Sequence, residues 1–303
     1  MVEFPQNSYY NRTNVLYDNV YYYTVCKLMA KIYIGTSGWS YPTGEGTWNG
    51  HFYPAGKIDE LAYYSRFFNT VEVNSSFYRP PNPVYAENWA KKTPDGFLFA
   101  VKLWQKFTHP KMHREVTGTN EVTISQADID LFRDGIEPLA KKGKLGPLLA
   151  QFPPSFTNDV FNRNILLAIF KSFKGYQLSV ELRHKSWSDD KNTAQILREN
   201  KVAWVQIDEP KFSSSIEAEL PITSDVAYFR FHGRNREMWW KGDVETRYKY
   251  LYSAAEITEL TNKIKLAAEK TQLLFAFFNN HWQGYAPRNA TDMKTALQLT
   301  MSD

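Results

Sequence analysis

The sequence contains a single cysteine, Cys26, among its 303 residues, so no disulfide can form within the chain. A chain without disulfides suits a reducing compartment, and we expect a cytoplasmic protein. No stretch reaches the roughly 18 consecutive apolar residues that a membrane-spanning helix requires. These absences argue against a disulfide-stabilised secreted domain and against a membrane partner.

The sequence also lacks the common glycine-rich and nucleophile motifs. It contains no G-x-x-x-x-G-K-[ST], no G-x-G-x-x-G and no G-x-S-x-G, so it does not indicate a nucleoside-triphosphatase, a dinucleotide-binding enzyme or a serine hydrolase. Six histidines are present, of which only His232 and His281 follow apolar runs. This is a sparse supply of metal ligands, so the cofactor is unknown and a metal ion stays an open alternative.

Eight short apolar runs are present and alternate with helical patterns, as in repeated βα units. Capping signals precede two of the helical patterns, at Ser125 and at Ser253. The connection between Asp208 and Val226 has little room for a helix, because it contains Ser213–Ser215 and Pro221. This order predicts an α/β fold, a single (β/α)₈ TIM barrel with one short or missing crossover helix. The runs are 32–35, 71–74, 97–103, 148–152, 178–182, 203–207, 227–231 and 273–278.

The first 28 residues differ from the rest of the chain. They contain six tyrosines and no glycine, and they precede both Met29 and the first apolar run. We therefore expect residues 1–28 to be an N-terminal extension outside the fold and residues 29–303 to form the barrel domain. A chain that starts at Met29 should keep the stability of the whole.

Polar side chains follow the apolar runs in a recurring pattern. In the stretch from Thr70 to Tyr78, a period of two predicts a strand with Glu72, Asn74 and Ser76 on one face. Burying a carboxylate and an amide is unfavourable unless they meet partners or a ligand. In a barrel all such strand ends converge on one mouth, where active sites lie. The sequence therefore predicts a site at the carboxyl ends of the strands.

Six short motifs, in order, resemble the YecE-like family, domain of unknown function 72. They are Gly35–Tyr41, Glu72–Tyr78, Leu149–Pro154, Glu181–His184, Phe231–Gly233 and Phe278–His281. The resemblance runs from about Ile32 to Ala290. It implies a TIM barrel with no established activity, and so supports the architecture and the location of the site without indicating its chemistry.

We interpret the predicted mouth as the site of a hydrolase that acts on an anionic ring-containing ligand: a phosphate ester of a sugar or nucleotide, or nucleic acid. Paired carboxylates can share acid and base work, cations stabilise developing negative charge, and tryptophans stack on rings. The predicted catalytic residues are Glu72, Glu181, Lys102 and His232. The predicted ligand-binding residues are Asn74, Gln151, Arg183, Asp208, Arg230, Asn279, His281, Trp39, Trp104 and Trp282.

Three alternatives remain at the level of the sequence. The protein is a glycoside hydrolase that uses the paired carboxylates, or a non-catalytic scaffold that binds nucleic acid or protein. In the third alternative, the carboxylates Glu72, Glu181 and Asp208 belong to a structural set of ion pairs with Lys102, Arg183 and Arg230.

Overall fold

The computed structural model describes residues 30–118, 124–242 and 244–299. Within these ranges the strands form two parallel sheets, one of four strands in the order β1-β9-β8-β7 and one of five in the order β2-β3-β4-β5-β6. The strands are β1 (Lys31–Thr36), β2 (Thr70–Val73), β3 (Leu98–Lys102), β4 (Leu145–Gln151), β5 (Leu178–Glu181), β6 (Ala203–Trp204), β7 (Gln206–Asp208), β8 (Val226–Phe231) and β9 (Leu273–Phe278).

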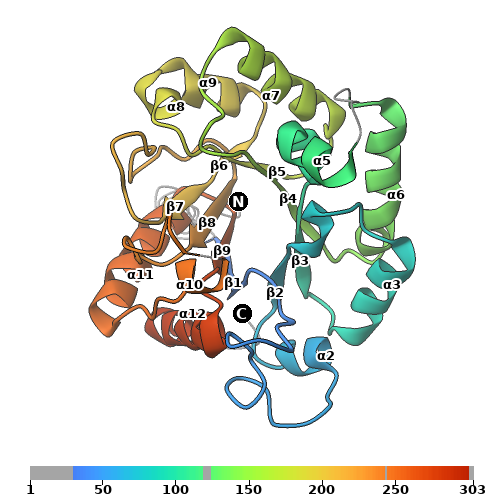
Figure 1. Ribbon diagram of the computed structural model, residues 1–303, viewed down its shortest axis with the longest axis vertical. Helices are drawn as coiled ribbons and strands as arrows, with labels where there is room; N and C mark the ends of the chain where they lie inside the picture. The colour runs from blue at the N-terminus through green and yellow to red at the C-terminus, as the bar shows by residue number, and fades with distance from the viewer. Residues whose placement is uncertain (1–29, 119–123, 243, 300–303) are drawn as a thin grey trace, which may run out of the picture.

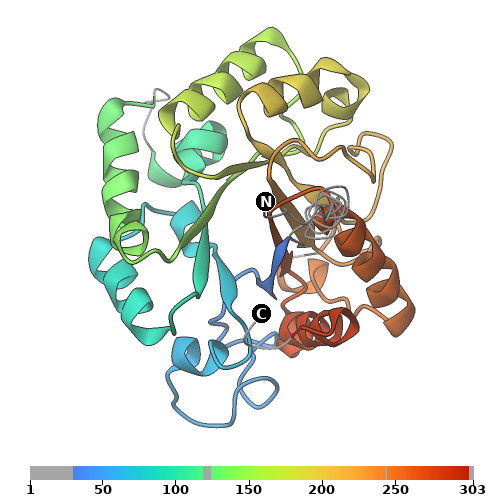
Figure 2. The same cartoon turned by 180° about the vertical axis from the view of Figure 1, so that it is seen from behind.

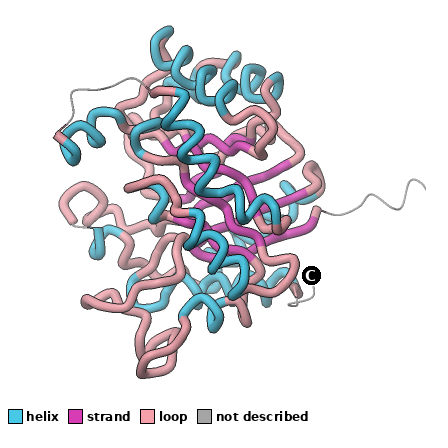
Figure 3. The backbone as a smooth tube through the Cα atoms, turned by 90° about the vertical axis from the view of Figure 1, so that its right-hand side faces the viewer, coloured by secondary structure: helices cyan, strands magenta, loops and turns pink. Residues whose placement is uncertain are grey.

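The helices surround the strands, as Figure 1 shows from one end of the strands and Figure 2 from behind. Figure 3 shows the strands side by side in the middle of the molecule with helices outside them. The helices are α2 (Glu60–Tyr64), α3 (Pro83–Lys92), α4 (Gln105–Thr108), α5 (Pro110–Thr117), α6 (Gln126–Lys141), α7 (Val160–Ser172), α8 (Ser186–Asp189), α9 (Asn192–Glu199), α10 (Val244–Arg247), α11 (Ala254–Ala268) and α12 (Tyr285–Leu297), with 3₁₀ turns η1 (Ser75–Phe77) and η2 (Trp282–Gly284).

Because helices cover the sheets from outside, the strands are buried on both faces and consist of nearly continuous apolar residues. The segment Leu274–Phe278 of β9, for example, is fully buried. The predicted helix starts are confirmed: Ser125 caps α6 and Ser253 caps α11, each through its hydroxyl and a reciprocal carboxylate. No helix in the described part of the chain is long and apolar enough to cross a membrane.

The two sheets meet at two seams. At one seam only Val205 separates β6 from β7, and its N–H donates to the Val180 carbonyl of β5. At the other seam, β1 approaches β2 so closely that a Cβ on Gly35 would lie 2.3 Å from the Thr70 carbonyl oxygen. The Tyr64 hydroxyl lies between these strands, where it accepts from the Thr36 N–H at 2.9 Å and donates to the Thr70 carbonyl at 3.1 Å.

All eight predicted runs contain strands, and the sixth is divided at Val205 into β6 and β7. The connection from Asp208 to Val226 contains no helix, as predicted. The strand predicted over Thr70–Tyr78 is wrong beyond Val73, because the chain turns into η1 there. The Ser76 hydroxyl bonds to the carbonyls of Val73 and Lys102 and does not continue the alternation. The prediction for residues 1–28 lies outside the described residues.

Candidate functional site

Arg230, at the end of β8, is the centre of a buried set of ion pairs. Its Nε and Nη2 atoms donate to the two carboxylate oxygens of Glu72 at 3.0 and 2.7 Å, and Nη1 donates to Glu181 Oε2 at 2.6 Å. Tyr228 donates its hydroxyl to Glu72 at 2.7 Å, and Gln151 accepts from Nη1 at 3.3 Å. Both carboxylates are fully buried, so neither keeps a water shell and both depend on the guanidinium.

Arg183, two residues beyond β5, extends this set. It donates to the second oxygen of Glu181 at 2.6 Å and lies 3.4 Å from Glu209. Despite burial, which acts in the opposite direction, Arg183 and Arg230 hold the pKa of Glu181 well below its ordinary value. We call Glu72, Glu181, Glu209, Arg183 and Arg230 the ion-pair network.

His232 is fully buried beside this network and is neutral. Burial is the main cause that lowers its pKa to about 3, and the two arginines add to the effect. Its Nε2 lies 3.2 Å from Arg183 Nη2, and its Nδ1 lies 2.9 Å from the Asn279 amide. A guanidinium only donates, so Nε2 accepts from Arg183, and the Asn279 atom beside Nδ1 is the amide nitrogen Nδ2.

Lys102, at the end of β3, has no ion-pair partner among the described residues. Its Nζ lies 4.0 Å from the centre of the Phe77 ring, and the residue is 9% exposed. Burial, with the Arg230 charge as the next cause, lowers its pKa to about 7. The carboxylates that would hold the ammonium form are bound to arginines instead.

A pocket of about 410 Å³ opens above the network, and we call it the strand-end pocket. It collects the last residues of β3 and β4, Arg230 near the end of β8, residues that follow β1, β2 and β9, and residues from α10 and the segment after it. Its lining is Gly38, Trp39, Ser40, Tyr41, Asn74, Ser75, Phe77, Tyr78, Lys102, Gln151, Arg230, Arg247, Tyr248, Asn279 and His281.

Three lining residues carry buried polar atoms without a hydrogen-bond partner in the described structure: Asn74 Oδ1, His281 Nδ1 and Arg247 Nε. Burial lowers the pKa of His281 to about 4, so this ring is neutral. Such unpaired atoms are unfavourable in an empty protein and indicate a ligand that supplies their partners. Together they offer such a ligand both acceptor and donor groups.

The structure thus brings seven of the predicted site residues into the pocket lining: Trp39, Asn74, Lys102, Gln151, Arg230, Asn279 and His281. Glu72, Glu181 and His232 are fully buried beside them, and Arg183 is partly buried there, without belonging to the lining. Sequence reasoning missed Arg247, Tyr248, Tyr41 and Tyr78. The last two lie within motifs already noted, whereas Arg247 follows no strand and gave no signal.

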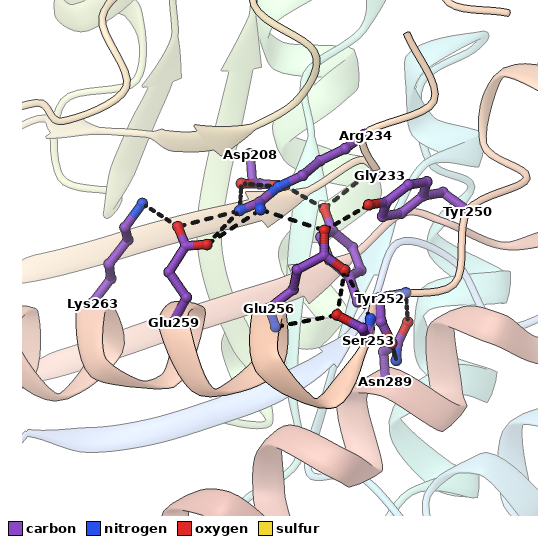
Figure 4. A network of polar contacts seen from close by, with 10 residues as sticks. All are labelled: Asp208, Gly233, Arg234, Tyr250, Tyr252, Ser253, Glu256, Glu259, Lys263 and Asn289. Carbon is purple, nitrogen blue, oxygen red and sulfur yellow. Dashed lines mark hydrogen bonds and ion pairs between the residues drawn. The ribbon is translucent and has the colours of Figure 1, made fainter. Parts of the chain in front are cut away.

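Asp208, Trp104 and Trp282 lie away from the strand-end pocket. Asp208 binds Arg234 at 2.7 Å and accepts from the Tyr252 hydroxyl, within the polar contacts that join β7 to α11 (Figure 4). Trp104 packs edge-on against Phe107 and His113. Trp282 is buried under the Lys249 ammonium, which is 4.3 Å from its ring centre. The aromatic part of the lining is therefore mainly tyrosine.

No group of three or more His, Cys, Asp or Glu side chains in residues 30–118, 124–242 and 244–299 is arranged to hold a metal ion. The acidic residues nearest the pocket are bound to arginines, which occupy the oxygens that a metal would need. We derive no metal-dependent step from this site.

Comparison with known proteins confirms the resemblance noted in the sequence. A family described as "Protein of unknown function DUF72" matches residues 33–303. The "UPF0759 protein YunF" of Bacillus subtilis is 29% identical over 284 residues, which cover 89% of this chain and 96% of YunF. The crystal structure of a DUF72 family protein from Thermotoga maritima has a TM-score of 0.77 and 35% identity and covers 89% of this chain and all of that one. A DUF72 structure from Enterococcus faecalis has a TM-score of 0.77 and 26% identity, covering 89% of this chain and 96% of that one.

Proposed function

Because this chain belongs to the DUF72 family, which is described only as proteins of unknown function, we propose a function from its strand-end pocket: the pocket binds an anionic, ring-containing ligand and hydrolyses it. One observation carries the proposal. The basic side chains of Lys102, Arg230 and Arg247 line the pocket, and no carboxylate is among the lining residues. A phosphate ester of a sugar or nucleotide, or the backbone of nucleic acid, supplies the missing negative charge.

The aromatic side chains that line the pocket favour a ligand that contains a ring. Tyr41 stacks on His281 with centroids 4.7 Å apart, and Tyr248 lies 5.4 Å from the same histidine. These three side chains form a continuous aromatic wall of the pocket. A flat or ring-shaped ligand gains contact area on such a wall, while the unpaired atoms of Asn74 and His281 orient its polar edge.

Lys102 is the residue that we assign to proton transfer. With a pKa of about 7, its amine is neutral in a large fraction of molecules at neutral pH and can remove a proton from an attacking water. The resulting ammonium can then return the proton to the leaving oxygen. Arg247 and the remaining N–H of Arg230 stabilise the negative charge that develops during attack.

Glu72, Glu181 and His232 act in this proposal as positioning residues. Each carboxylate binds Arg230 or Arg183 with short contacts, and His232 is neutral and held between Arg183 and Asn279. Glycoside hydrolysis needs a protonated carboxylic acid at the substrate. The low pKa of Glu181 and the absence of both carboxylates from the lining do not favour that alternative.

We further propose that the two sheets form one closed (β/α)₈ barrel. Two contacts support closure at the β1–β2 seam: Ser37 and Glu72 form a parallel bridge, and the Gly38 N–H donates to the Glu72 carbonyl at 2.8 Å. At the other seam β6 and β7 are one strand interrupted by a single residue. In a barrel the carboxyl ends of the strands form the binding face, as the pocket requires.

Inorganic phosphate tests the anion site. We expect phosphate to raise thermal stability with the logarithm of its concentration, by about 1.4 kcal/mol per tenfold increase once the site is saturated. Arg247→Gln should remove most of this effect, because it removes a lining cation that has no ion-pair partner among the described residues and leaves the ion-pair network intact. Arg163→Gln is the matched control, since Arg163 pairs with Asp190 outside the pocket. Equal stabilisation of all three proteins would indicate a general salt effect and contradict the site.

Nitrophenyl phosphate monoesters and diesters test hydrolysis. We expect slow release of nitrophenol by the native protein and a loss of about 100-fold or more in Lys102→Met, the size typical for removal of a general base. Phosphate should still stabilise that variant through Arg247. A Lys102→Met protein with native turnover would exclude Lys102 from the reaction. Phosphate binding without turnover of any ester would favour the non-catalytic alternative.

A further inference from the structure

We infer that the Lys102 amine forms a covalent imine with an aldehyde or ketone that carries an anionic group, and that the strand-end pocket is the site of this reaction. This inference rests on the proposed anion-binding function, and names a second class of compound for the same pocket. A neutral amine is both a base and a nucleophile, so the compound that enters decides which property is used.

The contacts around Lys102 meet the first requirement, a free amine. Its ammonium has no carboxylate partner in the described ranges, whereas Lys106, four residues further, pairs with Asp128 at 2.8 Å. Glu72 and Glu181 are the acidic residues that influence Lys102 electrostatically, and Arg230 binds both of them. The ion-pair network therefore withholds the negative charge that would fix Lys102 in its unreactive form.

The surroundings of Nζ also suit the product. The Phe77 ring centre lies 4.0 Å from Nζ, and a ring face attracts a cation through its quadrupole. A protonated imine carries the positive charge on this nitrogen, so Phe77 stabilises it without offering a proton acceptor.

The reaction balances without any further reagent. The Nζ lone pair attacks the carbonyl carbon, a C–N bond forms and the carbonyl oxygen takes up a proton. Loss of the nitrogen proton and departure of that oxygen as water give the imine, so one amine and one carbonyl compound yield one imine and one water. Arg247 binds the anionic group of the compound, and the wall of Tyr41, His281 and Tyr248 accommodates its ring.

Pyridoxal 5′-phosphate is a suitable probe because it combines an aldehyde, an aromatic ring and a phosphate. The whole protein is incubated with the probe, reduced with sodium borohydride and mapped by peptide mass spectrometry. We expect one dominant adduct, on Lys102, that excess inorganic phosphate suppresses. Lys144 is the internal control, because it is also buried but donates its Nζ protons to the carbonyls of Ala90 and Thr93 away from the pocket.

Variants separate the contributions to this result. Lys102→Met should abolish the dominant adduct, and its thermal melt shows that it is folded. Arg247→Gln keeps the amine but should lower the yield of the Lys102 adduct about tenfold, toward the yield obtained with pyridoxal, which lacks the phosphate. A tenfold loss corresponds to about 1.4 kcal/mol of binding free energy.

Labelling spread over surface lysines in proportion to exposure, or an unlabelled Lys102, would overturn the inference. If Lys102 is unlabelled but phosphate still stabilises the protein through Arg247, the anion site is supported and the imine inference is wrong. If Lys102 is labelled but phosphate does not stabilise the protein, the amine reacts as inferred and the proposed anion site is wrong.

Discussion

Replacement of Glu72 by glutamine should lower the free energy of unfolding by about 3 to 5 kcal/mol, the range found when one partner of a buried ion pair is removed. Glu72 is fully buried, and both of its oxygens accept hydrogen bonds, from Arg230 and from Tyr228. A glutamine amide has one acceptor and one donor end, so its NH₂ group would face another donor. The substitution also leaves Arg230 with Glu181 as its remaining carboxylate.

Denaturant melts at pH 7 measure this effect. Glu87→Gln is the control, because Glu87 forms an exposed i,i+4 pair with Lys91 and should change stability by less than about 1 kcal/mol. If Glu72→Gln left stability equal or improved it, Glu72 would not be a structural partner of Arg230. That result would return Glu72 to the acid–base role that the sequence first indicated.

Replacement of Lys102 by methionine should have the opposite sign and raise the free energy of unfolding at pH 7 by about 4 kcal/mol. In the folded protein burial lowers the Lys102 pKa from its ordinary 10.5 to about 7. Between these pH values the unfolded chain holds a proton that the folded protein has released, so this group makes stability rise with pH across the window. Below about pH 7 the full unfavourable contribution is present.

The gain from Lys102→Met should therefore be largest at pH 7 and below, and should disappear as the pH approaches 10.5. Melts of both proteins across this range measure the difference, and other titrating groups cancel in the comparison. Lys106→Met is the matched control and should destabilise, because it leaves Asp128 without its cation. Destabilisation by Lys102→Met would show that Lys102 has a structural partner. A residue that lowers the stability of the folded protein is typical of a functional site.

The sequence predicted the strands and their polar ends well because both signals are local. Each strand is a short apolar run, and a polar residue at its carboxyl end can be recognised without knowing the fold. The pairing of these ends is not local. The sequence showed that Glu72 and Glu181 approach several cations, but not that Arg230 would bind both. A guanidinium presents donors in several directions and can join two carboxylates, which a lysine ammonium does less well.

Two other parts of the site depended on tertiary contacts. Asp208 is the last residue of β7, as the pattern predicts, but it binds Arg234 and Tyr252 on the side of α11. Arg247 comes from the short helix α10, after no strand, and only the packing of that segment brings it to the pocket. Of the three tryptophans predicted to bind the ligand, Trp39 alone lines the strand-end pocket.

The charged residues at the strand ends fall into a paired, structural set and an unpaired, functional one, and the protonation of Lys102 tests this division most directly. NMR titration of a protein labelled with ¹³C and ¹⁵N in lysine, with Lys102→Met for assignment, measures it. We expect the Lys102 resonance to titrate near pH 7 and its midpoint to rise when phosphate binds beside the amine, since an anion favours the ammonium form. A Lys102 that titrates near 10.5 and does not respond to phosphate would contradict the account.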